Sequence, residues 1–140
     1  MCFLNKKTIF TIMIEHITKG IKISVNTTFN GTSYRRGNLY YDFSYSISIE
    51  NNSNETVKLT ERHWEIFDTL NKTEIIEGAG VIGQTPILNP NDTYAYTSGC
   101  FLSSNLGAMK GHYIMINQMN LDKFKVAIPT FQLITPLLLN

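Results

Sequence analysis

The sequence predicts an all-β sandwich of the immunoglobulin or fibronectin type III class, built from about seven or more strands. Three observations lead to this prediction. Apolar and polar residues alternate along most of the chain, turn-forming Asn, Gly and Pro recur roughly every 8–12 residues, and no apolar stripe with helical spacing is long enough for a helix. A chain without crossover helices cannot form a doubly wound α/β fold. Its 140 residues fit one domain, and neither a repeat nor a linker divides it.

The alternation is clearest in the first half of the chain. Ile21, Ile23 and Val25 alternate with polar residues, and the odd positions from 41 to 49 are all aromatic or isoleucine. Because successive side chains of a strand point to opposite faces, each segment has one apolar face for the core. The Asn-rich residues 51–54 that follow are expected to form a turn.

The strand expected over residues 57–68 changes phase along its length. Val57 and Leu59 are apolar at odd positions, whereas Trp64 and Ile66 are apolar at even positions. One extra residue, a β-bulge, would direct both pairs to the same core face. Trp64 is therefore predicted to anchor the core.

The second half is interpreted as shorter strands separated by longer loops. We expect strands at residues 74–76, 93–97, 111–118 and 123–128, a glycine-rich loop at 78–83, a brief extended piece between Pro86 and Pro90, an irregular stretch at 98–110 and a proline-bounded tail at 129–140. The abundance of Gly and Ser, which are typical of loops, is the reason for treating 98–110 as irregular.

The first twelve residues are predicted to lie outside the domain. Lys6 and Lys7 precede a short apolar run that loosely resembles a signal peptide, but Glu15 follows it and no small-residue cleavage site is present. The run is also much shorter than the ~20 residues that span a bilayer. Strand patterning begins after Met13, which favours a start codon assigned too early. We expect residues 1–12 to add nothing to the fold of the domain at 13–140.

Charge and cysteine content exclude several classes of function. Lys and Arg number 12 and Asp and Glu number 11, so the net charge of +1 offers no field that would attract nucleic acid or an anionic membrane. The two cysteines, Cys2 and Cys100, form no C-x-x-C pair, and a disulfide framework is not expected. This pattern fits a reducing compartment and predicts a cytoplasmic location, with Cys100 as a small half-buried apolar residue.

Gly78, Gly80 and Gly83 form a G-x-G-x-x-G motif. In dinucleotide-binding proteins such a motif precedes a helix whose N-terminus holds the pyrophosphate. Pro86 and Pro90 leave no room for that helix here, so the glycines are interpreted as turn residues. Backbone amides in the loop could still form an anion-binding nest, which keeps pyrophosphate binding open as an alternative.

No catalytic or metal site stands out in the sequence. Glu61, His63 and Glu65 share one face of a strand, an arrangement that could bind a divalent ion but is more often a solvated outer face. The run from Ser98 to Cys100 lacks the strand-turn-helix setting of a nucleophile. We therefore predict a protein that is not an enzyme and has no cofactor, no catalytic residues and no metal site.

A series of short motifs extends over the whole domain. They are Arg62-His63-Trp64, Gly78-x-Gly80-Val81-x-Gly83, Pro86-x-Leu88-x-Pro90, Tyr96-x-Ser98-Gly99-Cys100, Gly107-x-Met109-x-Gly111-x-Tyr113 and Ile128-Pro129-x-Phe131. Each motif is weak alone, but their order and spacing from about residue 14 to residue 140 resemble the ApaG family. Glu61 and Ala79 are minor departures from its pattern.

The resemblance implies a fibronectin-like sandwich and a role in recognition. Bacterial members are associated with cobalt and magnesium efflux, and eukaryotic relatives occur as domains of F-box and polymerase-interacting proteins. The expected function is a non-enzymatic binding module for an unidentified protein partner, with only an indirect effect on efflux because the chain has no membrane-spanning segment. Nucleotide or pyrophosphate binding at the glycine loop is the alternative, and a divalent-metal sensor built on His63 is a third hypothesis.

The expected recognition surface consists of family-like residues that packing does not require. These are Arg62, the loop glycines Gly78, Gly80 and Gly83, and Met109 with Lys110. Arg and exposed Met are typical of interface centres, and loops held by a rigid sandwich are common recognition sites. We expect Arg62, Met109 and Lys110 to lie together at one end of the sandwich, beside the glycine loop.

Overall fold

The computed structural model describes residues 13–136, which contain nine strands and no α-helix. The strands are β1 (Met13–Thr18), β2 (Ile21–Arg35), β3 (Asn38–Asn51), β4 (Val57–Asp68), β5 (Glu74–Ala79), β6 (Ile87–Leu88), β7 (Thr93–Leu102), β8 (Leu106–Asn117) and β9 (Lys123–Ile134). The extension predicted at residues 1–12 lies outside the described residues.

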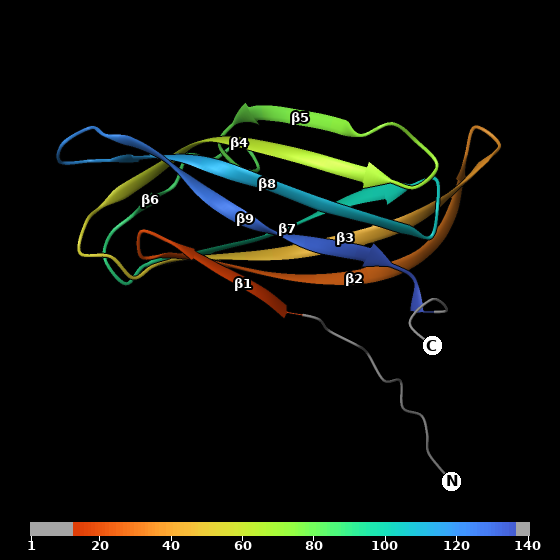
Figure 1. The fold of residues 1–140 in the computed structure, drawn as a ribbon, viewed down its shortest axis with the longest axis horizontal. Coiled ribbons are helices and arrows are strands. Elements are labelled where there is room, and N and C mark those ends of the chain that lie inside the picture. Colours follow the sequence, from red (N-terminus) through yellow and green to blue (C-terminus); the bar gives the residue numbers. More distant parts are fainter. Residues whose placement is uncertain (1–12, 137–140) are drawn as a thin grey trace, which may run out of the picture.

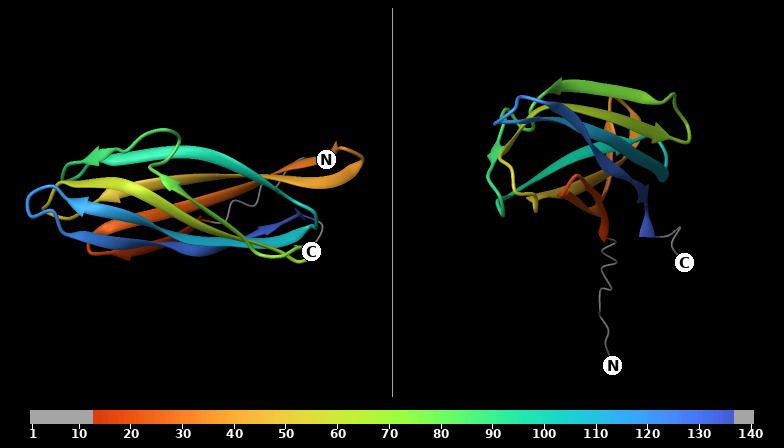
Figure 2. Two further views of the ribbon diagram at one scale, coloured as in Figure 1. Left: turned by 90° about the horizontal axis from the view of Figure 1, so that it is seen from above. Right: turned by 60° about the vertical axis from the view of Figure 1, so that its left-hand side comes forward.

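The strands form two antiparallel sheets that pack face to face. Sheet A has the order β1-β2-β3-β7, and sheet B has the order β5-β4-β8-β9, with the short β6 also paired to β4. Figures 1 and 2 show the two layers. The predicted β-sandwich is confirmed.

The core lies between the two sheets, as the alternating pattern predicts. Ile21, Ile23 and Val25 of β2 are at most 1% exposed. The inward-facing apolar residues of the other long strands are buried in the same core. Trp64 is 3% exposed and packs against two aromatic rings, at centroid distances of 5.4 Å from Tyr45 and 5.9 Å from Phe131. The aromatic cluster joins both sheets, because Tyr45 belongs to sheet A while Trp64 and Phe131 belong to sheet B.

The predicted bulge in β4 is present. Leu59 pairs with Met115 and Glu61 pairs with Ile114, so Thr60 is the extra residue in the ladder between β4 and β8. Burial changes phase at this point, since Leu59 faces the core before the bulge and Trp64 faces it afterwards. The same shift turns Arg62 inward.

The expectation of an irregular stretch at 98–110 is wrong. β7 continues to Leu102 and β8 begins at Leu106, so only a short turn separates them. The glycines mark close approaches of neighbouring strands rather than loops: a Cβ at Gly107 would lie 2.3 Å from the carbonyl oxygen of Phe67, and one at Gly99 would lie 3.1 Å from that of Phe43. β9 also extends to Ile134, into the predicted tail.

The two long sides of the sandwich differ. On one side β1 contacts β9, and the backbone N–H of Ala127 donates a hydrogen bond to Thr18 Oγ1 at 3.3 Å. On the other side the edge strands are β5 of sheet B and β7 of sheet A. A cavity separates these two strands, so one side is closed and the other is open.

Truncating the central indole should be costly. We expect Trp64→Ala to lower the free energy of unfolding by about 3–5 kcal/mol, because the change removes contacts with both sheets and leaves a cavity. Urea denaturation measures this, with Tyr34→Ala as the control, since Tyr34 is 75% exposed. A loss of less than about 1 kcal/mol for Trp64→Ala would contradict the core assignment.

Candidate functional site

The candidate site, here called the open-edge cavity, lies between β5 and β7. Its volume is about 400 Å³, and both sheets contribute to its walls. Trp64, Ile76, Val81 and Met109 are among its apolar residues, and Arg62, Glu74, Tyr45, Tyr96, Ser98 and Cys100 are among its polar ones. This combination of an apolar interior with a few polar groups is typical of ligand-binding sites.

Arg62 forms one end of the open-edge cavity and also braces the glycine loop. Its Nη1 donates hydrogen bonds to the carbonyl oxygens of Ala79 at 2.9 Å and Gly80 at 3.0 Å. A Cβ at Gly78 would lie 2.9 Å from Arg62 Nη2, so the guanidinium covers this glycine closely. Arg62 therefore has a structural role that the sequence did not indicate, and it lies along the long edge rather than at an end of the sandwich.

The positive charge of Arg62 has no partner among the described residues. No carboxylate in residues 13–136 lies within ion-pair distance of it, and its Nε and Nη2 make no hydrogen bond there. Burial raises the pKa of Tyr45 and Tyr96, and the nearby Arg62 charge opposes part of that rise. An unpaired cation thus lies beside phenol groups that stay protonated.

The glycine loop is a tight hairpin turn. Val81 N donates to Gln84 O at 2.8 Å, Gln84 N donates to Val81 O at 2.9 Å, and Gly80 N donates to Thr60 O at 2.8 Å. Ile82 and Gly83 occupy the turn with φ of 47° and 71°, as in a type I′ turn. The amides of Gly80, Val81 and Gln84 are thus bonded within the chain and are not free to contribute to the anion-binding nest that the pyrophosphate alternative requires.

Gly80 is required by its surroundings. Its φ is 61°, and a Cβ there would lie 2.0 Å from the carbonyl oxygen of Gln84. Any other residue would push apart the pair of hydrogen bonds that closes the turn. The motif is therefore explained by backbone geometry.

Ile82 has an unfavourable backbone conformation at the mouth of the open-edge cavity. A β-branched residue at φ 47° is an outlier, because this region of conformational space favours Gly, Asn and Asp. Its side chain is 58% exposed and lines the cavity, so core packing does not account for it. Strain of this kind persists mainly at functional sites.

Met109 and Lys110 do not form a surface patch with Arg62. Met109 is 1% exposed, and the Cys100 thiol donates to its Sδ at 3.8 Å, so the expectation of an exposed interface methionine is wrong. Lys110 faces the opposite side of β8, with Nζ 5.6 Å from the centroid of the Phe67 ring. Adjacent strand residues point to opposite faces, which separates these two. Arg62 and Met109 do line the same cavity.

Cys100 is unsuited to nucleophilic chemistry. Burial raises the pKa of its thiol to about 12, and the charges of Glu74 and Asp68 add to the rise. The thiol is therefore protonated at neutral pH, whereas a nucleophilic cysteine needs its thiolate form.

The outer face of sheet B carries the histidines. Glu61, His63 and Glu65 lie on this face as expected, and His63 Nδ1 lies 2.5 Å from Glu77 Oε2 while its ring stacks on His112 at 4.8 Å. Burial lowers the pKa of His112, and the charge of His63 contributes. Within residues 13–136, no group of three or more His, Cys, Asp or Glu residues is arranged to hold a metal ion.

Sequence reasoning missed several residues of the open-edge cavity. Tyr45, Tyr96 and Glu74 belong to three different strands, and nothing local indicates that they meet. Ile82 could have been noticed, because isoleucine is unusual at a position of a type I′ turn that normally holds Asn or Gly.

No helix in the described part of the chain is long and apolar enough to cross a membrane.

Relieving the strain at Ile82 should stabilise the fold. We expect Ile82→Asn to raise the free energy of unfolding by about 0.5–1 kcal/mol, because Asn tolerates positive φ. Thermal and urea denaturation measure the change, and Val81→Asn is the opposite control because Val81 is 1% exposed. A destabilised Ile82→Asn protein would show that Ile82 contributes packing that outweighs its strain.

The glycine loop should not bind nucleotides. We expect ATP, GTP and NAD to give no saturable heat in titration calorimetry, because no helix follows the loop and the amides of Gly80, Val81 and Gln84 are already bonded within the chain. Micromolar binding of any of the three that is weakened by Gly83→Asn would contradict this. That substitution keeps the turn, since Gly83 has open space around it and Asn accepts its φ of 71°.

Comparisons with known proteins identify the family of the chain. The model of the ApaG domain matches residues 32–117. Protein ApaG of Beijerinckia indica is 40% identical over 124 residues, which cover 89% of this chain and 95% of that protein. Protein ApaG of Shewanella halifaxensis is 38% identical over 127 residues, which cover 91% of this chain and all of that protein.

Two solved structures extend the similarity to the fold. The X-ray structure of Northeast Structural Genomics Consortium target SoR45 has a TM-score of 0.78 and 38% identity, covering 84% of this chain and 88% of that one. The putative ApaA protein of Bordetella pertussis has a TM-score of 0.70 and 31% identity, covering 86% and 98%. The resemblance seen in the motifs is thus confirmed, and the chain belongs to the ApaG family.

Proposed function

We propose that this chain is a non-enzymatic binding module that recognises a protein partner along the open edge of the sandwich. The observation that carries the proposal is β7. This edge strand has ten residues, none of which is charged or proline, and it pairs only with β3 within the described residues. Natural proteins usually protect exposed edges with charges, prolines or bulges, and β7 has none of these.

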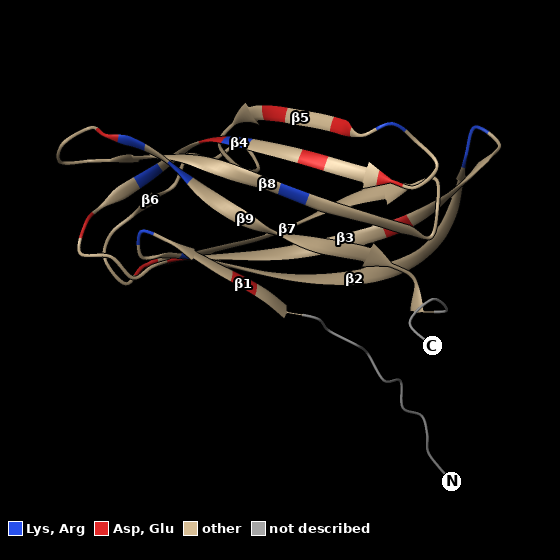
Figure 3. Ribbon diagram, viewed as in Figure 1, with Lys and Arg blue, Asp and Glu red and all other residues tan. Residues whose placement is uncertain are grey.

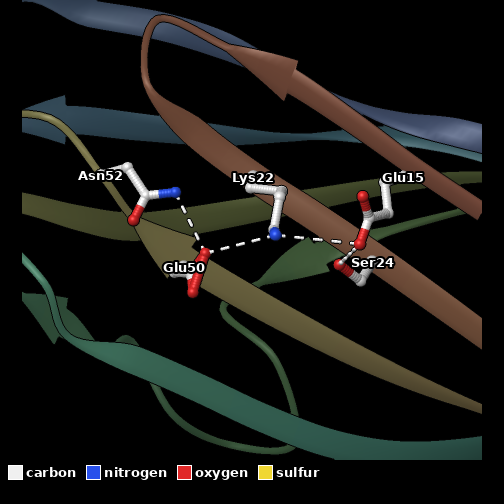
Figure 4. A network of polar contacts seen from close by, with 5 residues as sticks. All are labelled: Glu15, Lys22, Ser24, Glu50 and Asn52. Carbon is white, nitrogen blue, oxygen red and sulfur yellow. Dashed lines mark hydrogen bonds and ion pairs between the residues drawn. The ribbon is translucent and has the colours of Figure 1, made fainter.

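Elsewhere on sheet A, charges do occupy the outer face. Lys22 Nζ lies 3.8 Å from Glu15 and 3.5 Å from Glu50, and Asn52 donates a hydrogen bond to Glu50 (Figure 4). The hydrogen bond from Asn52 and the charge of Lys22 lower the pKa of Glu50. This network lies on β1, β2 and the end of β3, where Glu50 is opposite Thr93 of β7, and the Arg35 guanidinium of β2 lies 4.0 Å from the centroid of the Phe101 ring. β7 itself contains no charged residue and is drawn without one in Figure 3.

The other edge strand of the open side is protected. β5 has only six residues, and two of them are the carboxylates Glu74 and Glu77. Of the two strands that border the open-edge cavity, β7 is therefore the one suited to accept an added strand. In such β-augmentation, main-chain hydrogen bonds provide affinity and pockets beside the edge provide specificity.

The open-edge cavity is the pocket that this mode of binding requires. Tyr96, Ser98 and Cys100 of β7 line it from one side, and residues of sheet B line it from the other. A partner strand on β7 would therefore place inward side chains at the mouth of this cavity. The location is cytoplasmic in this proposal, and any effect on cobalt or magnesium efflux is transmitted through the partner.

Site-specific cross-linking in cells tests the role of β7. A photoreactive phenylalanine analogue at Phe101, which is 51% exposed on β7, should give a discrete cross-linked protein, whereas the analogue at Tyr34 in the β2–β3 hairpin region should not. Ala95→Lys adds a charge to the exposed face of β7 and should reduce the cross-linked product at least tenfold, equivalent to about 1.4 kcal/mol. Equal products from both positions, or no effect of Ala95→Lys, would contradict the proposal.

A further inference from the structure

We propose that the open-edge cavity binds a single carboxylate group carried on an aromatic or aliphatic body, with Arg62 as its cationic partner. This inference rests on the proposed function in one respect, namely that the cavity is the specificity pocket beside β7. It adds the chemistry of the group that the pocket accepts, which the edge strand alone does not determine.

Arg62 has hydrogen-bonding capacity that the chain does not use. A guanidinium has five N–H donors in a planar fork. Nη1 is used on the carbonyls of Ala79 and Gly80, while Nε and Nη2 have no partner within residues 13–136. A half-buried cation without a counter-charge is unfavourable, and a carboxylate at the free edge of the fork would correct this with two parallel hydrogen bonds.

Tyrosine hydroxyls supply further donors next to the guanidinium. The hydroxyl oxygens of Tyr96 and Tyr113 lie 2.5 Å apart, and this mutual bond uses only one of their two protons. Burial raises the pKa of both phenols, so both stay protonated at physiological pH. When Tyr113, which is fully buried, donates this bond, the proton of Tyr96 is available to an acceptor in the cavity. The hydroxyl of Tyr45 belongs to the same cavity wall.

The remainder of the cavity suits an apolar body. Trp64, Ile76, Val81 and Met109 contribute to its walls, and about 400 Å³ is at the small end of ligand-binding sites. The space matches one large side chain or a small aromatic acid, and a ligand with an extended polar portion would leave buried polar groups unpaired.

The charges around the cavity favour one negative charge over two or more. Glu74 also lines the cavity and stands four residues before Gly78 on β5, and Gly78 is paired with Arg62. Arg62 is thus located at one end and Glu74 at the other. A carboxylate near Arg62 is separated from Glu74, whereas a phosphate dianion would bring two negative charges to a single cation, and the amides of Gly80, Val81 and Gln84 are already bonded. The planar fork also matches a planar carboxylate.

Ile82 gives independent support for a ligand at this position. Its side chain is at the cavity mouth and 58% exposed, although its φ of 47° is costly for a β-branched residue. Contact with the apolar body of a bound ligand would bury this side chain, which the free protein leaves exposed. Such strain is common at ligand clamps.

A matched set of small probes tests the inference on the full chain. We would titrate 3-phenylpropionate, 3-phenylpropionamide and phenyl phosphate into isotopically labelled protein and follow the amide resonances by NMR. The carboxylate should bind saturably, at least about tenfold more tightly than the amide, and more tightly than the phosphate, with shifts centred on Ser98, Cys100 and Arg62. Equal affinity of carboxylate and amide, shifts elsewhere, or no saturable binding of any probe would overturn the proposal.

Three variants locate the site and keep the test decisive. Arg62→Lys keeps the positive charge but removes the planar guanidinium that can form two parallel hydrogen bonds. The variant should lose most of the difference in affinity between 3-phenylpropionate and 3-phenylpropionamide. If that variant fails to fold, Glu74→Gln serves instead, because Glu74 is exposed; it should strengthen binding of the carboxylate and leave the amide unchanged. Ile82→Asn should weaken both probes. An unchanged carboxylate affinity in both Glu74→Gln and Ile82→Asn would overturn the site.

Ala95→Lys separates this inference from the proposed function. Ala95 is on the outer face of β7, away from the cavity, so the variant should bind 3-phenylpropionate as tightly as the unmodified chain. If cross-linking at Phe101 fails while probe binding holds, the partner proposal is wrong and the carboxylate site stands. If probe binding fails while cross-linking at Phe101 holds, the carboxylate site is wrong and the partner proposal stands.

Discussion

The β-bulge at Thr60 is the constraint on which both the core and the site depend. Without the extra residue, the side chains after it would reverse faces, placing Glu61 and His63 in the core and Trp64 on the surface. With it, Trp64 joins the inter-sheet aromatic cluster, and Arg62 faces inward to hold the carbonyls of Ala79 and Gly80. One inserted residue thus connects the packing of the sandwich with the shape of its open edge.

Three departures from ordinary structural rules lie on this open edge. Arg62 is half-buried and unpaired within the described chain, Ile82 has an unfavourable φ, and β7 lacks the charges that protect exposed strands. The opposite side, where β1 contacts β9, is closed by direct packing. Natural proteins tolerate such local conflicts mainly at functional sites, so their grouping around one cavity supports a binding role there.

Much of the fold followed from the alternation of residues, but some boundaries did not. The bulge and the burial of Trp64 were predicted, because each depends on the phase of a single strand. Residues 98–110 were mistaken for a loop, because Gly looks the same in sequence whether it forms a turn or permits a close approach of strands, as Gly107 does against Phe67. Met109 was placed on the surface for the same reason, although β8 buries it.

The sequence by itself determined the class of fold, the core faces of the main strands and the ApaG-like motif series, because each is a property of neighbouring or regularly spaced residues. Only the tertiary structure decided what Arg62 contacts, that the amides of Gly80, Val81 and Gln84 are bonded within the chain, and that Tyr45, Tyr96 and Glu74 share one cavity with Arg62. These features depend on contacts between residues that lie on different strands and far apart in the chain. No local pattern encodes which of those residues meet.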